Sequence, residues 1–158
     1  GADGAAGPPI GVIQHTATRV ENQVIVAGGA LPGGGGRALA RDTTRIDVSG
    51  SWQVTHPAGL NQPRRDHQAV LLNEFVVVAG GQGRGMEPAE QVEVFDPTAG
   101  EWFPMGELEV PRVAFSLVRW GERGLVLGGK LVPAPKAYGS RAHKAIEPAP
   151  GRYVKAKA

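Results

Sequence analysis

Short apolar runs alternate with turn residues through most of the chain and predict a β-rich fold. In the middle of the sequence, His67–Leu72 and Phe75–Ala79 are two such runs, separated by two turn residues. Gln91–Phe95 then alternates polar and apolar positions, which is typical of a half-buried strand. Asp96–Gly100 has the composition of a turn, and Glu101–Phe103 follows as a fourth short run. We therefore predict a four-stranded antiparallel meander in about 50 residues.

The same plan recurs on both sides of this segment. His15–Val20, Val24–Ala27 and Thr44–Val48 predict three strands of an earlier repeat, and Ala114–Trp120 and Leu125–Leu127 begin a later one. Two kinds of marker keep a period of about 50 residues, which indicates a repeat architecture. The markers are Gly28-Gly29, Gly80-Gly81 and Gly128-Gly129, followed by Trp52, Trp102 and Tyr153.

The order of these features resembles the kelch repeat family. Gly80-Gly81 ends a strand pair, Val92–Pro97 leads into an Asp-Pro turn, and Trp102 follows. Pro63-Arg64 and Pro111-Arg112 match the arginine that commonly begins the next repeat. The resemblance implies an all-β fold, namely a kelch-type β-propeller segment of about three four-stranded blades. The first repeat departs from the pattern, because it has no such arginine and a turn before its fourth strand that we expect to be shortened.

Packing of the blades gives the repeated markers a structural role. We expect each diglycine to let backbones crowd at the inner end of a blade, where a Cβ would clash. Trp52 and Trp102 are expected to fill the gaps between adjacent blades. Tyr153 lies where a third aromatic would stand, but His143–Ile146 before it is a poor strand. This region is either a worn blade edge or an extended tail, and we favour the tail.

The resemblance divides the chain into three parts. Residues 1–11 are expected to be a flexible N-terminal segment, residues 12–130 the propeller blades, and residues 131–158 a tail rich in basic residues, proline and alanine, or a degenerate blade edge. Propellers close with about four to eight blades. The chain is therefore a fragment, pairs with another chain, or forms a ring with a second copy, which would bring the total to about six blades.

Charge is distributed unevenly along the chain. Residues 1–129 hold ten arginines and fourteen acidic residues, whereas residues 130–158 hold seven basic residues and Glu147 alone. Such a tail could neutralise nucleic-acid phosphates, with Tyr138 and Tyr153 stacking on bases. The alternative is a solubilising or partner-clamped terminus.

The long loops of a propeller carry the candidate binding residues. Loops that join the second strand to the third, and the fourth to the next blade, leave the same face, and here they are rich in arginine. We predict that this face binds a protein partner, for example an acidic one, through bidentate contacts to carboxylate or phosphate groups. Its members are Arg37, Arg41, Arg64, Arg65 and Arg84. The alternative for Arg64, which recurs as Arg112, is packing or hydrogen bonding between blades.

Catalysis is the less favoured alternative. The chain has no cysteine, which excludes disulfides, thiolate ligands and the cross-linked cofactor of copper radical oxidases, which share the propeller form. Four histidines form no cluster with ligand spacing, and Gly80–Gly85 lacks the spacing of a dinucleotide-binding loop. We expect no catalytic residue, metal or cofactor. No membrane span or secretory signal is predicted, and no compartment is indicated.

The sequence thus favours a protein-interaction or scaffold module built on a kelch propeller face. The second reading is a subunit of a larger multi-chain or nucleic-acid-containing assembly, anchored by its basic C-terminal tail. The third is a fragment of a propeller enzyme.

Overall fold

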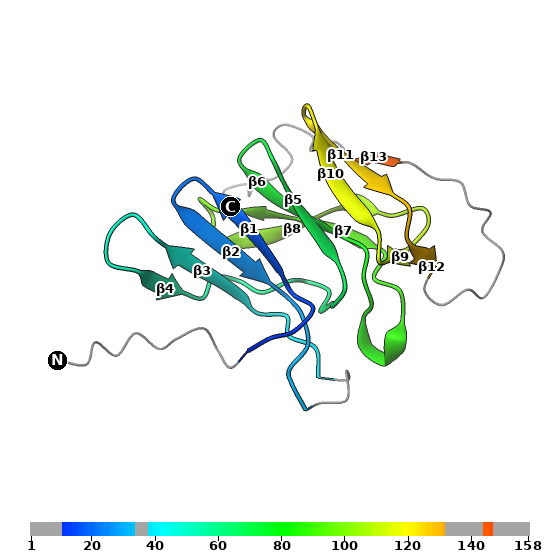
Figure 1. Cartoon of the computed structure of the whole chain (residues 1–158), viewed down its shortest axis with the longest axis horizontal. Helices are drawn as coiled ribbons and strands as arrows, with labels where there is room; N and C mark the ends of the chain where they lie inside the picture. The colour runs from blue at the N-terminus through cyan, green and yellow to red at the C-terminus, as the bar shows by residue number, and fades with distance from the viewer. Residues whose placement is uncertain (1–10, 34–37, 132–143, 147–158) are drawn as a thin grey trace, which may run out of the picture.

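The structure is a computed structural model that describes residues 11–33, 38–131 and 144–146. These residues form antiparallel sheets that stand side by side like the leaves of a fan (Figure 1). Blade 1 is a four-stranded sheet in chain order, made of β1 (Thr16–Val20), β2 (Gln23–Ala27), β3 (Thr43–Asp47) and β4 (Gln53–Thr55). Blade 2 repeats this order with β5 (Gln68–Leu72), β6 (Phe75–Ala79), β7 (Gln91–Asp96) and β8 (Glu101–Glu107).

Blade 3 is a three-stranded sheet among the residues that the structure describes. It consists of β10 (Ser116–Trp120), β11 (Arg123–Leu127) and β13 (Lys144–Ile146). A short ladder of β9 (Arg112–Val113) with β12 (Lys130–Leu131) extends its first strand pair. β13 pairs with β11 in the place that a third strand takes in the other blades. Tyr153 and nearly all of the predicted tail lie outside the described residues.

The observed strand order is the meander that the sequence predicts. The predicted four-strand order of the first two repeats is confirmed, with strand ends shifted by a few residues. The hairpin turns share one conformation, because the first turn residue has a positive φ in every blade: 52° at Glu21, 55° at Asn73 and 62° at Gly121. The single 3-10 turn, η1 (Arg84–Met86), lies in the loop after β6. It is too short to cross a membrane, and no other helix occurs in the described part of the chain.

The core lies between the blades, so each blade has two faces to consider. We call the face toward the following blade the back face and the face toward the preceding blade the front face. Ile25 and Ala27 on the back of blade 1 pack with Val76 and Val78 on the front of blade 2. A second cluster joins the back of blade 2 to the front of blade 3. Both faces of blade 2 are therefore buried, which explains why β6 is continuously apolar rather than alternating.

The diglycines lie where neighbouring backbones meet. A Cβ on Gly80 would lie 2.7 Å from the carbonyl oxygen of Arg112, and Gly80 has a φ of +65°. Gly28 makes the same approach to Arg64 in blade 2, at 2.8 Å. The N–H of the second glycine donates to the same carbonyl, from Gly29 to Arg64 at 2.8 Å and from Gly81 to Arg112 at 2.9 Å. Glycine is thus required for adjacent blades to bond through their backbones.

The two tryptophans of the predicted period are not equivalent. Trp102 lies opposite Phe95 in β7–β8, is buried, and donates from Nε1 to Thr43 Oγ1 of blade 1 at 2.8 Å. In blade 1 the residue at that register is Val54, and Trp52 lies in the preceding turn, 72% exposed. The expectation that Trp52 fills a gap between blades is corrected. The turn before β4 has five residues, 48–52, rather than the shortened length expected, whereas blade 2 has four, 97–100.

Candidate interaction surface

Arg64 lies inside the molecule and not on its surface. Its Nη2 donates to Glu93 Oε1 at 2.9 Å, and both side chains are fully buried. Nη1 donates to the carbonyl of Gly80 and Nε to that of Gln62, each at 3.2 Å. Burial lowers the pKa of Arg64, and the neighbouring Glu93 carboxylate opposes that shift. The prediction that Arg64 contacts a partner is therefore wrong, and its alternative role within the propeller is the one observed.

Glu93 anchors the connection between blades 1 and 2. Its Oε2 accepts hydrogen bonds from the backbone N–H of Asn61 at 2.6 Å and from Asn61 Nδ2 at 2.8 Å. Its Oε1 also accepts from the N–H of Gln62 at 3.0 Å. A buried carboxylate with this many donors is compensated for the loss of water. The ion pair therefore holds the segment that connects blades 1 and 2 against β7 rather than binding a ligand.

Arg65 supports a loop. Its Nη2 donates to Gln82 Oε1 at 3.1 Å, and its Nε lies 3.8 Å from Asp66 Oδ2. Its backbone also pairs with Gln82 at the start of the loop that follows β6. With its side chain 15% exposed, Arg65 presents little of its guanidinium to solvent.

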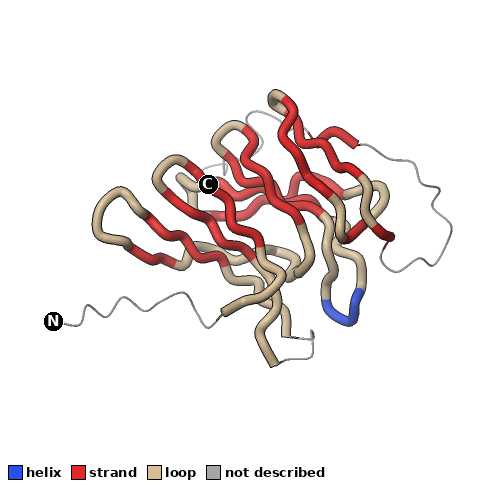
Figure 2. Tube along the Cα trace, in the orientation of Figure 1, coloured by secondary structure: helices blue, strands red, loops and turns tan. Residues whose placement is uncertain are grey.

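Arg41 and Arg84 are the predicted arginines that the structure leaves exposed. Arg84 begins η1, at the tip of the loop 82–90, which projects from the same end of the blades as the loop after β2 (Figure 2). Arg37 lies outside the described residues.

Exposed apolar side chains accompany these arginines. Met86 ends η1 and is 61% exposed, and Leu31, at the start of the loop after β2, is 43% exposed. The tip of η1 holds two successive residues at positive φ, Gly85 at 64° and Met86 at 66°. Positive φ is uncommon for a methionine, so the loop holds this side chain outward at a conformational cost. We name Leu31, Arg41, Arg84 and Met86 the loop face.

The loop face is mixed in charge. Asp42 stands next to Arg41, and Glu87 and Glu90 follow Met86, all three exposed. Because positive and negative side chains alternate on this surface, it favours a partner that carries charges of both signs around an apolar centre.

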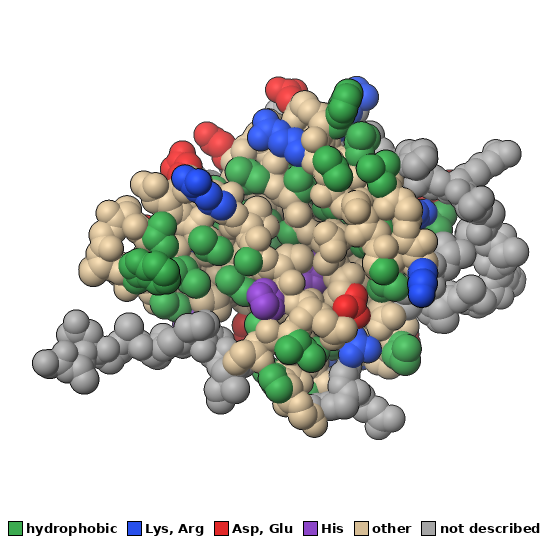
Figure 3. Space-filling view, in the orientation of Figure 1, with side chains coloured by type: hydrophobic (Ala, Val, Ile, Leu, Met, Phe, Trp, Pro, Cys, Tyr) green, Lys and Arg blue, Asp and Glu red, His purple; other side chains and the backbone are tan. Residues whose placement is uncertain are grey.

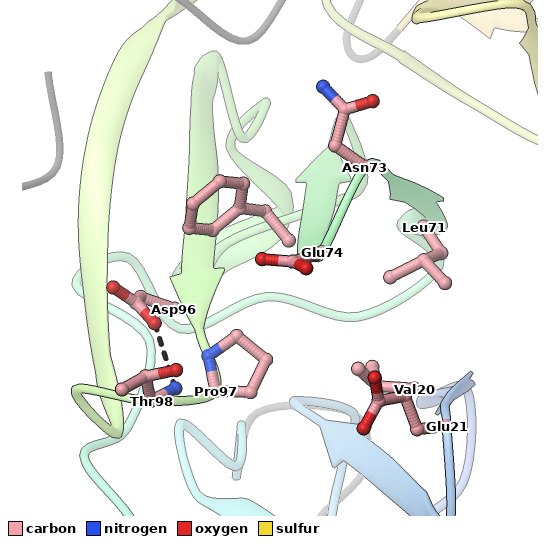
Figure 4. A pocket seen from close by; sticks show the side chains of 9 residues that line it. Val20, Glu21, Leu71, Asn73, Glu74, Asp96, Pro97 and Thr98 are labelled. Atoms are coloured by element: carbon pink, nitrogen blue, oxygen red, sulfur yellow. Dashed lines mark hydrogen bonds between the residues drawn. The ribbon is translucent and has the colours of Figure 1, made fainter. Parts of the chain in front are cut away.

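A cavity of about 490 Å³ lies at the opposite end of blades 1 and 2. The hairpin and β7–β8 turns line it, and Figure 4 shows Glu21, Glu74 and Asp96 around the same hollow, with Val20 beside Glu21. Asp96 Oδ1 accepts from the backbone N–H of Thr98 at 2.8 Å, so it holds its own turn together. The predicted arginines are absent from this lining.

His67, which is buried directly before β5, also has a structural role. His67 Nε2 lies 2.9 Å from Thr16 Oγ1 across the interface between blades 1 and 2. Burial, together with the positive charge of Arg64, lowers the pKa of His67 to about 3. His67 is thus neutral in the folded protein at physiological pH. Within the described part of the chain, no three histidine, cysteine or acidic side chains gather in a way that could hold a metal ion.

Sequence reasoning missed two members of these sites. Glu93 was visible only as the polar residue in an alternating strand, although a carboxylate at a buried position needs a cation such as Arg64. Met86 gave no signal in the sequence, because its exposure follows from the conformation of η1.

No protein-family model matches the sequence. Host cell factor 1 from Rattus norvegicus and Homo sapiens is 32% identical over 71 residues, a stretch that is 43% of this chain and 3% of either relative. The chain thus spans a small part of the curated relatives that it matches.

Two solved structures share the fold. The structure of YjhT superimposes with a TM-score of 0.69 and 16% identity, over 88% of this chain and 43% of that chain. A fungal alcohol oxidase of the AA5 family, solved in complex with copper, superimposes with a TM-score of 0.67 and 20% identity, over 75% of this chain and 27% of that one. Both are kelch-type β-propellers. The all-β fold predicted from the repeats is confirmed: the described sheets have the strand order and arrangement of β-propeller blades.

Proposed function

We propose that this chain is a protein-interaction module that binds its partner through the loop face. The observation that carries the proposal is Met86, 61% exposed and held at positive φ at the tip of η1, two residues after the exposed Arg84. An exposed apolar side chain next to an arginine is the composition of an interface centre. The rigid blades below position these loops, as scaffolds do in other binding proteins.

The charges of the loop face indicate the partner. Arg41 and Arg84 suit carboxylates on a partner segment, and the neighbouring acidic residues Asp42 and Glu87 suit an occasional basic residue. An acidic peptide segment with an apolar anchor fits this arrangement. The buried pair of Arg64 and Glu93 serves the partner indirectly, by fixing the loop bases.

Selection of peptides from a displayed library on the immobilised chain tests the proposal. We expect enrichment of acidic peptides with a large apolar residue, and at least a tenfold weaker affinity for the variant Arg41→Glu/Arg84→Glu. Met86→Asp should weaken binding to a similar degree. Arg119→Glu, at the opposite end of the blades, is the matched control and should leave affinity unchanged. Selected peptides that bind the loop-face variants as tightly as the unchanged chain would refute the proposal.

A second candidate rests on the charge of residues 130–158, which hold seven basic residues and one acidic residue. Such an arm could anchor the chain to nucleic acid in a larger assembly, with strong salt dependence. Retention on RNA that falls with salt and disappears when residues 131–158 are removed would support this candidate. Retention that survives the truncation would contradict it.

A further inference from the structure

The back face of blade 3 is apolar, and the part of the chain that the structure describes leaves it uncovered. Its members are Val118, Trp120, Leu125 and Leu127, which take the register positions of Val70, Leu72, Val77 and Ala79 in blade 2. In blade 2 blade 3 covers this face, and Leu72 is fully buried. In blade 3 Trp120 is 71% exposed, and Val118 is 45% exposed. Hydrophobic side chains gather there and over β3 and β4 at the other end of the fan (Figure 3).

The front face of blade 1 is the second uncovered face. Its apolar members are Ala17, Val24, Val26, Ile46 and Val54, which take the register positions of Ala69, Val76, Val78, Phe95 and Trp102 in blade 2. In blade 2 that face packs on blade 1 and is closed to solvent at Val76 and Phe95. In blade 1 the same positions are half-buried or exposed. Each uncovered face therefore corresponds to one side of an interface that exists inside the chain.

A polar pair shows that the two uncovered faces match each other. Between blades 1 and 2, the hydroxyl of Thr16 bonds the imidazole of His67. By register, Ser116 of blade 3 takes the position of Thr16. His15 of blade 1 takes the position of His67, because it lies against Gly29 as His67 lies against Gly81. Both Ser116 and His15 are exposed. The back face of blade 3 thus offers a hydroxyl and the front face of blade 1 an imidazole, the same two groups that bond between blades 1 and 2. Between blades 2 and 3, Gln68 and Phe115 take these two positions instead.

The diglycine of blade 3, Gly128-Gly129, also indicates that the two uncovered faces match. A Cβ on Gly28 would lie 2.9 Å from the ring of His67, and one on Gly80 would lie 2.6 Å from the ring of Phe115. Gly128 has the same positive φ, +68°, but nothing lies within 4 Å of its Cβ position. By equivalence, the group that fits beside Gly128 is the ring of His15 from another blade 1.

Side-chain volume is also complementary. The back of blade 3 carries larger groups than the back of blade 2, with Trp120 for Leu72 and Leu127 for Ala79. The front of blade 1 carries smaller groups than the front of blade 2, with Val54 at the register of Trp102. Cores that keep their total volume tolerate such exchanges.

We propose that a second copy of this chain covers both faces, back of blade 3 against front of blade 1, and that the two copies close a ring of about six blades. A ring of this size lies within the range of closed propellers, which a trimer of three-bladed chains would exceed. Each contact joins two different faces, and it occurs twice in the dimer, so the closed ring leaves neither face of blade 1 or blade 3 uncovered.

Light scattering on the unchanged chain and three variants tests this pairing. The unchanged chain should have about twice its monomer mass of 16.5 kDa. Val118→Glu disables the back of blade 3, and Val24→Glu disables the front of blade 1; each variant alone should be monomeric. Mixed in equal amounts, they should form a dimer again, because each still offers one intact face to the other. Met86→Glu, on the loop face, is the control and should remain dimeric. Circular dichroism and a cooperative unfolding transition establish that each variant is folded.

The outcomes separate the alternatives. A monomeric unchanged chain overturns the proposal and indicates that further blades, from a longer form of this chain or from another polypeptide, cover these faces. Dimerisation in which only one of the two variants is monomeric, or in which mixing restores nothing, means that like faces pair, which also overturns it. Peptide binding at the loop face is measured separately, so the failure of either proposal is distinguishable from failure of the other.

Discussion

The interior of the fan and its two outer faces present the same register positions in opposite environments. Leu72 on the back of blade 2 is fully buried, and Trp120 at the same position of blade 3 is 71% exposed. His67 is buried, and its counterpart His15 is exposed. The local sequence thus builds a blade, but the neighbouring blade determines what each face contributes to stability. The difference can be measured by substituting pairs of equivalent residues, one inside the fan and one on an outer face, and comparing the changes in stability.

The largest contrast is expected at the third strand. Glu93→Ala removes the partner of the buried Arg64 and should lower the free energy of unfolding by about 3–5 kcal/mol. Thr44 takes the same register position in blade 1, and its hydroxyl lies 3.5 Å from His56 Nδ1. Thr44→Ala should cost about 1 kcal/mol. Urea unfolding followed by circular dichroism measures both values, and equal losses would show that the ion pair does not distinguish the blades.

The second contrast concerns apolar burial. Leu72→Ala should cost about 2–5 kcal/mol, because it leaves a cavity between blades 2 and 3. Trp120→Ala should change stability by less than about 1 kcal/mol at low protein concentration, where the back face of blade 3 is free. The cost of Trp120→Ala should then rise with protein concentration, because the second copy covers this face. A large, concentration-independent cost would mean that Trp120 packs within its own chain.

The third contrast concerns the diglycines. Gly80→Ala places a methyl group against the carbonyl of Arg112 and the ring of Phe115, in addition to the strain of a positive φ. Gly128→Ala meets the strain alone, which is about 1 kcal/mol. Thermal unfolding in dilute solution should therefore show the larger loss for Gly80→Ala, by about 1–3 kcal/mol. Identical losses would mean that the blades shift apart readily.

The last contrast is measured as a slope of stability with pH. The pKa of His67 is about 3 in the folded protein, below the ordinary value of 6.5 expected after unfolding. Below pH 6.5 the unfolded chain therefore binds a proton that the folded chain rejects. Stability should fall as pH decreases from 6.5 toward 3, with a slope of up to about 1.4 kcal/mol per pH unit. His67→Gln should flatten this slope. An unchanged slope in His67→Gln would assign the pH dependence to other groups.

Most of the fold could be predicted from the sequence, because strands and turns are local. The run Phe75–Ala79 and the turn at Asp96–Gly100 carry their structure in their own residues. The role of Trp52 could not be predicted in the same way. Its spacing from Trp102 suggested equivalence, but a turn of five residues rather than four displaces it from the register. Sequence spacing does not show where an extra turn residue is placed.

The candidate site was less predictable, because it depends on which side chains the tertiary structure covers. Arg64 and Arg84 both follow turn-forming residues, yet one is fully buried against Glu93 and the other is exposed on η1. Distinguishing them requires the position of a carboxylate that is 29 residues away in the chain. The exposure of Met86 likewise follows from backbone geometry that composition does not specify.

The most direct test of the account uses the absence of cysteine from this chain. One variant carries Gly128→Cys and another carries His15→Cys, and the two are mixed under mild oxidation. The account predicts a covalent heterodimer, because the two positions should meet as Gly28 and His67 do inside the chain. Gly121→Cys, at the other end of β10–β11, is the matched control and should not cross-link to the cysteine at position 15. A cross-link at position 121 as efficient as that at position 128, or none at position 128, would contradict the account.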